Sequence, residues 1–530
     1  MPLQIAPVGT HPEGESKSAL LPLTSVLPDR LAVDTLGGRV HVEWDPHAPV
    51  TPMGQLVFFA QFLQTSGRFE SWVGDCPWTY SSPNAPQVRD VLGTVLLSVL
   101  AGHHRYAHIN SLRGDTLNPP LLNMGRVASE DSVRQALKRS RGDEALTASV
   151  VTWQQRHLHE SYAPLLSVPW ILDIDSTIKP IYGHQQGAEV GYNPHKPGRP
   201  SHVYHTYLMG AARLVLDVEV QPGKQTAAQH ALPGLWRLVD ALPASARPWL
   251  VRGDCHFGNE RVLSEAESRQ QKYLFKLRLT RKPKDLIRLL ERQGKWEDAG
   301  QGWTGREATL QLQGWSRARR VLVLRRPVVA TQQAPGPLLS EGARPLLLPW
   351  PELTVLASAP EYEYAVLVTS LTEGLLAVAQ LYRDRGDAEN NFDELKNQWG
   401  WAGFTTHDLL RCQITARNIA LIYNWWSLFV RLADPSLRRE AITSRPLLLH
   451  AVARGSRHGG QTTVTVTSAH AEASKVREML TKVSQFLSAL KATAEQLTDG
   501  QRWCRILSRI FEHLLGGKTV TMPAGATASG

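Results

Sequence analysis

The segment VPWILDIDSTIKPIYG, residues 168–183, reads as a buried β-strand that ends in turn residues. Asp173 and Asp175 stand two positions apart, so on a strand both side chains point to one face while Leu172 and Ile174 point to the other. Charges at the end of a buried strand need a partner, which can be a metal ion, a helix N-terminus or a nearby arginine. The segment therefore predicts an acidic strand end whose partner must come from elsewhere in the chain.

The surrounding segments predict a mixed α/β sheet. Helical patterns at 225–243 and 259–270 alternate with short β-rich runs, which are HVYHTYLMGAARLVLDVEV (202–220), PWLVRGD (248–254) and KYLFKLRL (272–279). Asp254 ends the second of these runs, and Gly253 and Gly258 on either side allow the backbone to turn. Strand ends that open onto a crevice are where ligand-binding groups gather in such sheets, so two acidic strand ends are better evidence than one.

A third carboxylate comes from the predicted helix LYRDRGDAENNFDELKNQWG, residues 381–400. At about 100° per residue, Tyr382, Arg385, Glu389 and Lys396 fall within an arc of roughly 60°. This face is unusually polar, although the Arg385 and Glu389 pair alone is more often a surface ion pair. Three carboxylates approaching from two strands and a helix could hold two Mg²⁺ ions for displacement at a phosphodiester. Arg385 and Lys396 would then contact phosphate oxygens near the cleaved bond.

Composition narrows the classes of protein and of partner. The 530 residues favour two to four domains, and 42% hydrophobic with 20% charged residues are typical of a folded chain. The formal charge of +10 favours a polyanionic partner, first of all nucleic acid. The four cysteines lie far apart and favour reduced thiols in a cytoplasm. The distribution of apolar and charged residues matches neither a secretory leader nor a membrane span, so we expect neither secretion nor membrane insertion.

The chain resembles the DDE transposases of bacterial insertion sequences, in the superfamily of insertion sequence four type with a Y-x2-R-x3-E-x6-K signature. Tyr382, Arg385, Glu389 and Lys396 match this spacing without a gap. DIDST around Asp175 is similar to the first catalytic Asp motif of that family, which leaves Asp173 as the less favoured ligand. RGDCHF around Asp254 is similar to the second, with Cys255 and His256 in place of the small or basic residues more usual there.

The segments GYNPHKPGRPSHVYH (191–205) and YAHINSLRGDTLNP (106–119) resemble the group named after insertion sequence thirteen-eighty. The resemblance implies that Asp175, Asp254 and Glu389 are catalytic metal ligands for two Mg²⁺ ions per site, with Mn²⁺ able to substitute. It also implies a homodimer in a synaptic complex on double-stranded DNA, with terminal inverted repeats and target DNA as substrates, in the bacterial nucleoid. Some members of the superfamily release the element through end hairpins, with a flipped base held by an aromatic residue. Candidates for that residue here are Trp303, Trp315, Tyr362 and Tyr364.

The resemblance further implies an RNase H-like catalytic core, a mixed five-stranded sheet with flanking helices, interrupted by a β-rich insertion. We expect helical N- and C-terminal regions around it. The expected domains are a flexible arm (1–30), a mainly helical DNA-binding region (31–160), the first part of the core (161–293), the insertion (294–360), the second part of the core with the Glu-bearing helix (361–435), and a helical region for dimerisation and synapsis (436–530).

Additional DNA contacts are expected from two basic stretches. Lys196 and Arg199 lie in a loop punctuated by proline and glycine after the first catalytic strand, where a solvated loop is the alternative. Arg281, Lys282 and Lys284 belong to the run FKLRLTRKPKDLIRLLERQGK, where a solvated charged face is the alternative. His103, His104, His205 and His256 lack a partner at ligand spacing and are expected to be structural or at the surface.

Two rivals remain for the function. One is an RNase H-like DNA nuclease that cuts without strand transfer, and the other is a catalytically silent DNA-binding regulator derived from a transposase. The presence of all three carboxylates, together with Arg385 and Lys396, argues against the silent regulator.

Overall fold

The computed structural model describes residues 30–45, 47–80, 82–193, 196–328, 361–467, 472–493 and 496–521, except for the side chains of 387–389. The chain divides into two compact units, 1–48 and 49–530, which are treated separately. The expected flexible arm falls outside the described residues apart from Arg30, and so does the part of the expected insertion from 329 to 360.

The first unit contains a hairpin of β1 (Arg30–Thr35) and β2 (Gly38–Glu43), which the sequence analysis did not predict. Alternation puts valines and Leu31 on one face of the hairpin. The other face carries ion pairs between Arg30 and Glu43 and between Arg39 and Asp34. Such a two-stranded ribbon is at best marginally stable by itself in water.

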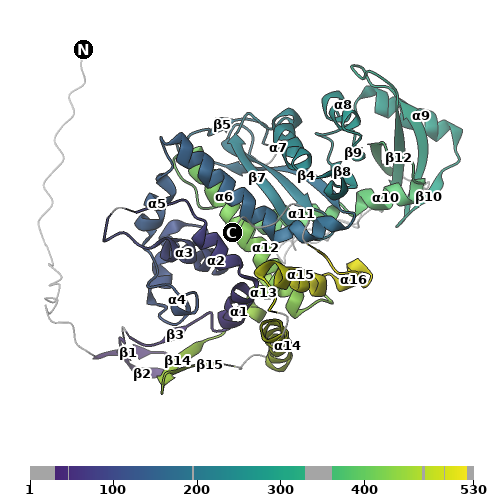
Figure 1. Cartoon of the computed structure of the whole chain (residues 1–530). Coiled ribbons are helices and arrows are strands. Elements are labelled where there is room, and N and C mark those ends of the chain that lie inside the picture. Colours follow the sequence, from purple (N-terminus) through teal and green to yellow (C-terminus); the bar gives the residue numbers. More distant parts are fainter. Residues whose placement is uncertain are drawn as a thin grey trace, which may run out of the picture. The chain divides into compact units, whose positions relative to one another are not determined.

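The second unit is built around one large mixed sheet (Figure 1). Within the described residues it has ten strands in the order β10-β11-β12-β13-β9-β8-β4-β6-β5, with β7 also paired to β6. The neighbours β4, β8 and β9 run parallel, and all other pairs are antiparallel. The expected mixed α/β class is confirmed. The strands are β4 (Ile171–Pro180), β5 (Glu189–Val190), β6 (Pro200–Met209), β7 (Leu214–Pro222), β8 (Leu250–Gly253), β9 (Tyr273–Lys276), β10 (Glu297–Gly300), β11 (Trp303–Leu310), β12 (Arg319–Pro327) and β13 (Tyr362–Thr369).

The helices predicted at 225–243 and 259–270 are present as α7 (Ala228–Asp240) and α8 (Glu260–Ser268). A short 3₁₀ turn, Ala244–Ala246, links α7 to β8, and α9 (Arg281–Gln293) packs against β11. The strands β10, β11 and β12 pair in turn, and β12 pairs with β13, so the strands from 297 to 327 continue the same sheet.

The region before the sheet is mainly helical, with one short strand at its start. Its elements are β3 (Val50–Thr51), α1 (Leu56–Ser66), α2 (Arg68–Gly74), α3 (Val88–Leu100), α4 (Asn118–Leu121), α5 (Glu130–Lys138) and α6 (Glu144–Tyr162), with 3₁₀ helices at Tyr106–Gly114 and Ala163–Ser167. Ser129 caps α5, because its hydroxyl accepts the Ser132 N–H at 3.2 Å.

The longest helix in the described part of the chain, α12 (Leu409–Ala433), packs on β7 and α6 (Figure 1). It contributes the buried aromatic side chains Tyr423, Trp425, Trp426 and Phe429. Phe59 of α1 lies edge-on to Trp426 and Phe429 of α12, with ring centroids 5.3 Å away in both cases. Trp503 of α15 packs against the same group of aromatic rings through Phe62. The N- and C-terminal regions therefore share one core with the sheet.

The region after α12 contains strands as well as the expected helices. It comprises α13 (Ala441–Leu448), β14 (Ala453–His458), β15 (Gln461–Val466), α14 (Ala473–Ala492), α15 (Asp499–Ile510) and α16 (Glu512–Leu515). β14 pairs with both β15 and β3, so a strand from the start of this unit completes a small sheet near its end. No helix within the described ranges is both long and apolar enough to cross a membrane.

The single helix predicted over 381–400 is divided in the structure. α10 (Leu375–Arg383) ends before α11 (Gly386–Asn397) begins, and the Arg385 N–H bonds to the Tyr382 carbonyl at 3.1 Å, one residue nearer than in an α-helix. Gly386 is a weak helix former, and contacts between the junction and the sheet replace the missing helical bonds. The sequence analysis placed Tyr382 and Lys396 on one helix face, within an arc of roughly 60°. That placement does not hold, because it assumed one continuous helix.

Candidate active site

Asp175 and Asp254 each come directly after the last paired residues of two adjacent parallel strands, β4 and β8. Asp254 follows the end of β8, whereas Asp175 lies inside β4, which continues to Pro180 in pairing with β6, so the strand end predicted at Asp175 is wrong. In the register of β4 and β8, Ile174 stands opposite Gly253, so each Asp is the next residue along its strand. Their side chains are 18% and 25% exposed, which makes both reachable from solvent. Leu172 and Ile174 are buried on the opposite face, as the alternation predicted. The two carboxylates are thus held at one edge by the strand pairing itself.

Arg385 forms an ion pair with the first of these carboxylates. Its Nη2 donates to Asp175 Oδ2 at 2.5 Å, and the Arg385 side chain is only 4% exposed. Burial disfavours the charged guanidinium, but Asp175, Tyr382 and Asp254 together raise the pKa of Arg385 above its ordinary value. Arg385 therefore stays cationic and offsets the negative charge of Asp175 and Asp254.

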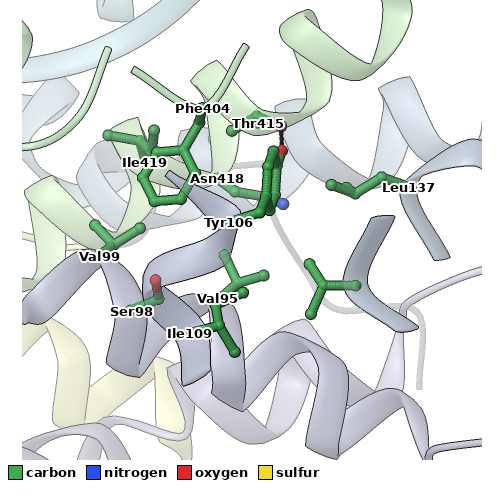
Figure 2. A pocket seen from close by; sticks show the side chains of 11 residues that line it. Val95, Ser98, Val99, Tyr106, Ile109, Leu137, Phe404, Thr415, Asn418 and Ile419 are labelled. Carbon is green, nitrogen blue, oxygen red and sulfur yellow. Dashed lines mark hydrogen bonds between the residues drawn. The ribbon is translucent and has the colours of Figure 1, made fainter. Parts of the chain in front are cut away.

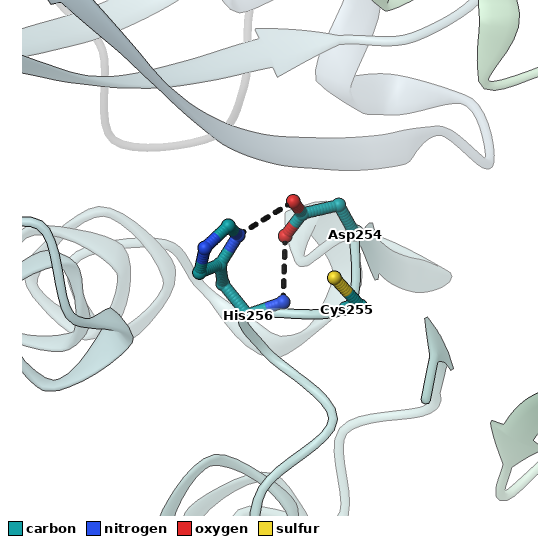
Figure 3. Close-up of side chains that lie close together, drawn as sticks. All are labelled: Asp254, Cys255 and His256. Atoms are coloured by element: carbon teal, nitrogen blue, oxygen red, sulfur yellow. Dashed lines mark hydrogen bonds and ion pairs between the residues drawn. The ribbon is translucent and has the colours of Figure 1, made fainter. Parts of the chain in front are cut away.

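His256 is bonded to the second carboxylate (Figure 3). Its backbone N–H donates to Asp254 Oδ1 at 2.9 Å, and its ring Nδ1 lies 2.7 Å from Oδ2. The bond to Asp254 raises the pKa of His256. Burial favours the neutral acid form of Asp254, but the bonds from His256 and the nearby Arg385 outweigh it and lower the pKa of Asp254. The expectation that His256 is merely structural or at the surface missed this contact, although its spacing of two residues from Asp254 in a turn was a signal for it.

Two sets of groups here could hold a metal ion. Asp254, Cys255 and His256 offer ligand atoms that all lie within 4.8 Å of one another. Asp175 and Asp254 offer only carboxylate oxygens, which are the donors that hard divalent cations prefer, whereas sulfur and imidazole suit softer metals. The oxygen donors on two rigid strands fit a hard divalent cation.

Three members of the four-residue signature lie on α10 and α11. Glu389 is in the first turn of α11, and its side chain lies outside the described part of the structure. Tyr382 is partly buried at the end of α10, where it packs against the apolar cluster that includes Val378. Lys396 is partly exposed in the last turn of α11. The structure therefore brings Asp175, Asp254 and Arg385 together. Of Glu389 it describes only the backbone, one helical turn after Arg385.

Residues 84–488, well over half of the chain, match the family model described as the transposase DDE domain group 1. The chain belongs to this transposase family. No curated protein matches the sequence. Among solved structures, the transposase is similar to one described as a cryo-EM structure of the piggyBac transposase synaptic complex with hairpin DNA. The two share 10% identity with a TM-score of 0.36, over 87% of this chain and 85% of that chain.

Asp173, the less favoured ligand of the transposase, has an arginine as its partner. Arg252 of β8 donates through Nε and Nη2 to the two oxygens of Asp173 at 2.6 and 2.7 Å, and both residues are buried. Of the alternatives that the sequence left open for this Asp, a nearby arginine is the one that the structure contains.

The loop between β4 and β6 carries exposed cations and aromatic rings. Lys196 and Arg199 are exposed, and their charged groups lie 5.2 and 4.8 Å from the ring centroid of Tyr182, which is itself exposed. Tyr192, also exposed, packs against His256 with ring centroids 6.0 Å apart. The loop of the transposase therefore reaches the Asp254 turn.

A groove of about 950 Å³ extends from the same turn. Cys255 and His256 line one part of it, and Arg281 and Lys282 of α9 line another. Arg281, Lys282 and Lys284 are all exposed. The groove of the transposase thus connects the turn that follows Asp254 with the basic start of α9.

Of the four aromatic candidates for a flipped base, Trp315 lines this groove, and the other three lie on the strands β11 and β13. Trp315 is buried beneath Arg319, and Trp303 lies under Arg326, with the guanidinium carbons 5.0 and 4.9 Å from the ring centroids. Tyr362 stacks under Arg325 at 4.3 Å, and the Tyr364 hydroxyl donates to Glu291 at 2.8 Å. Each ring already has a packing or polar partner in the fold.

One small apolar cavity of the transposase is a packing gap. It lies among the N-terminal helices and α12, has a volume of about 20 Å³, and is lined by side chains such as Val95, Ile109 and Phe404 (Figure 2). The Tyr106 hydroxyl and Thr415 Oγ1, 2.8 Å apart, satisfy each other at its wall. A dry space of this size is far below the few hundred Å³ of ligand pockets.

Proposed function

We propose that this transposase cleaves DNA at terminal inverted repeats and joins the freed ends to target DNA in cut-and-paste movement. The observation that carries the proposal is the placement of Asp175 and Asp254 directly after the last paired residues of the parallel strands β4 and β8, with Arg385 bonded to Asp175. Glu389 completes the proposed set from the first turn of α11.

The catalytic core is proposed to be RNase H-like. The five neighbouring strands β7, β6, β4, β8 and β9 support this, since they form a mixed sheet with helices α7 and α8 in the connections. The domain boundaries expected from the sequence, including an insertion from 294 to 360 and a C-terminal region for synapsis, remain part of the proposal.

Membership of the family implies use of a divalent metal, and we propose Mg²⁺, two ions per site, with Mn²⁺ able to substitute. When bound, the ions would activate the attacking water or 3′-hydroxyl and stabilise the leaving oxygen. Asp175, Asp254 and Glu389 would hold them, because these residues offer only oxygen donors.

The other residues of the chain have distinct proposed roles. Arg385 neutralises the charge of Asp175 and would donate hydrogen bonds to a phosphate oxygen of bound DNA. Lys396 would contact a phosphate further along α11. Tyr382 packs at the end of α10 and holds in place the backbone that leads to Arg385. His256 orients the Asp254 carboxylate through its ring and backbone bonds.

The proposed DNA path follows the groove from the Asp254 turn toward Arg281, Lys282 and Lys284, with Lys196 and Arg199 on the β4–β6 loop beside it. A homodimer in the bacterial nucleoid would hold two transposon ends, and release through end hairpins remains part of the proposal. The net charge of +10 supports a DNA partner.

The test is cleavage of labelled DNA that carries the element's own terminal repeats, with and without Mg²⁺. Glu389→Gln keeps the size of the side chain and removes its charge, so we expect cleavage to fall about 10³-fold or more. The matched control is Asp393→Asn, an exposed acid one turn further along α11, which should cleave like wild type.

Three results would redirect the proposal. Cleavage that survives Glu389→Gln would remove Glu389 from the catalytic set. Cleavage without joining of a pre-cleaved end to target DNA would favour the nuclease, and tight binding without cleavage in any protein would favour the silent regulator.

The basic start of α9 gives a separate prediction on salt dependence. The triple variant Arg281→Ser/Lys282→Ser/Lys284→Ser should reduce the slope of log affinity against log salt by about two to three, because each lost phosphate contact removes about 0.9. Band shifts at several salt concentrations measure the slope. Lys491→Ser, an exposed lysine on α14, is the control, and a triple variant with the same slope as wild type would exclude these residues from the DNA path.

A further inference from the structure

A buried ion pair lies on the same face of the sheet as the proposed metal ligands. Asp173 stands directly opposite Arg252 in the register of β4 and β8, and each lies two residues before Asp175 and Asp254. Because side chains alternate along strands, all four groups point to one face. Both oxygens of Asp173 accept hydrogen bonds from Arg252, at 2.6 and 2.7 Å. The two side chains of the pair therefore hold each other in a fixed orientation, next to Asp175 and Asp254 on the same face of the sheet.

The same arginine also contacts the helical segment. Arg252 Nη1 donates to the carbonyl of Leu381, in the last turn of α10. Carbonyls at the end of a helix lack the N–H groups of a following turn, and here the Arg385 N–H bonds instead to Tyr382. Arg252 therefore supplies a donor where the helix is interrupted.

A second contact between the sheet and this junction lies four residues further on, where Arg385 donates to Asp175 at 2.5 Å. Two arginines thus connect the α10–α11 junction to both Asp-bearing strands, one through a backbone carbonyl and the other through a carboxylate. Glu389 follows Arg385 by one helical turn, so the position of its backbone depends on these two attachments.

Stability alone is a weak reason for such a pair. Removing two charges from water costs several kcal/mol, and buried ion pairs can often be replaced by apolar side chains without loss of stability. The neighbouring strand also leaves room for the pair. A Cβ on Gly210 would lie 2.6 Å from Asp173 Oδ2 and 2.9 Å from Arg252 Nη2, so even a methyl group there would displace the charged groups.

We propose that Asp173 and Arg252 are positioning residues that hold the start of α11, and with it Glu389, in register with Asp175 and Asp254. Neither contacts the reacting atoms. Asp173 orients the guanidinium of Arg252, and Arg252 fixes the end of α10. The catalytic consequence rests on the proposed function, whereas the mechanical consequence for the α10–α11 junction does not.

The primary test is amide hydrogen exchange of the full-length protein over 381–393. In Arg252→Lys the single ammonium group cannot bond both Asp173 oxygens and the Leu381 carbonyl as the guanidinium does. We expect exchange in this segment to be at least about tenfold faster, with the rest of the sheet unchanged. Arg417→Lys is the matched control, since Arg417 is likewise buried and bonded to both oxygens of Asp217, at 2.8 and 3.0 Å.

The second readout separates positioning from folding. In the double variant Asp173→Leu/Arg252→Met no unpaired charge is left behind, so the fold should persist while the attachment to Leu381 is lost. Mg²⁺-dependent cleavage should fall about 10²-fold with the affinity for terminal DNA unchanged. Gly210→Ala keeps both charges and should change exchange and cleavage in the same direction.

The two proposals can fail independently. Wild-type exchange over 381–393 in both Arg252→Lys and the double variant would overturn the positioning role, whatever the enzyme does. If the wild-type protein cleaves no DNA, the proposed function fails, and the exchange result still decides whether the pair holds the junction.

Discussion

Asp254→Asn lowers the rate of Mg²⁺-dependent DNA cleavage about 10³-fold or more, while terminal DNA binding stays within about threefold. This effect on activity is as large as the one expected for Glu389→Gln. The amide keeps the size of the side chain and can still bond the His256 backbone N–H, now 2.9 Å from Oδ1. What is lost is the negative charge, and a neutral amide oxygen is a much poorer ligand for a divalent cation.

The experiment needs a control that carries the same change close to the turn of Asp254. Asp285→Asn fits, because Asp285 is an exposed acid on α9 that lines the groove beside Cys255 and His256. Single-turnover cleavage and band shifts with all three proteins separate chemistry from binding. An Asp254→Asn enzyme that cleaves as fast as Asp285→Asn would remove Asp254 from the proposed metal site.

The two acidic positions could be predicted from sequence because their signals are local, although the strand of Asp175 does not end there and continues to Pro180. Alternation along 168–183 already put Asp175 opposite the buried Ile174, and a glycine-bounded apolar run placed Asp254 at a strand end. What the pattern could not supply was the pairing of these strands. Adjacent, parallel pairing of β4 with β8 is a contact between residues far apart in sequence, and it is what brings the two carboxylates to one edge.

The interruption between α10 and α11 shows why the helix prediction failed. Residues 375–397 have helical spacing throughout, and a periodicity of 3.6 residues contains no information on contacts with other elements. In the structure, Arg252 bonds the Leu381 carbonyl and Arg385 turns toward Asp175, so tertiary contacts replace helical hydrogen bonds at the junction. The four-residue signature from Tyr382 to Lys396 therefore spans the α10–α11 junction, which its spacing alone could not indicate.

Long-range strand pairing also accounts for the elements that the sequence analysis did not anticipate. β14 pairs with β3, some 400 positions earlier in the chain, although the C-terminal region was expected to be helical. Gln461–Val466, the strand β15, is rich in threonine and valine, which was a local signal for a strand. Its partner could not be found without the fold.

The largest expected loss of stability comes from Phe59→Ala. Phe59 is fully buried on α1, and its ring packs edge-on against Trp426 and Phe429 of α12 at 5.3 Å. Truncation removes the apolar contacts of the ring and leaves a cavity that rigid helices can fill only in part, so we expect a loss of about 3–5 kcal/mol in the free energy of unfolding. Urea unfolding followed by tryptophan fluorescence measures it, since Trp426 lies beside the changed site.

The control for this prediction is Leu514→Ala, a truncation on the exposed surface of α16 that should change stability by no more than about 0.5 kcal/mol. Comparing the two variants tests whether the N-terminal helices share a core with α12 or only lie next to it. If α1 unfolds independently, Phe59→Ala adds an early transition and leaves the main one in place. If the core is shared, as the aromatic contacts indicate, the whole transition moves to lower urea, because α12 also packs on β7 and so connects α1 to the sheet that carries Asp175.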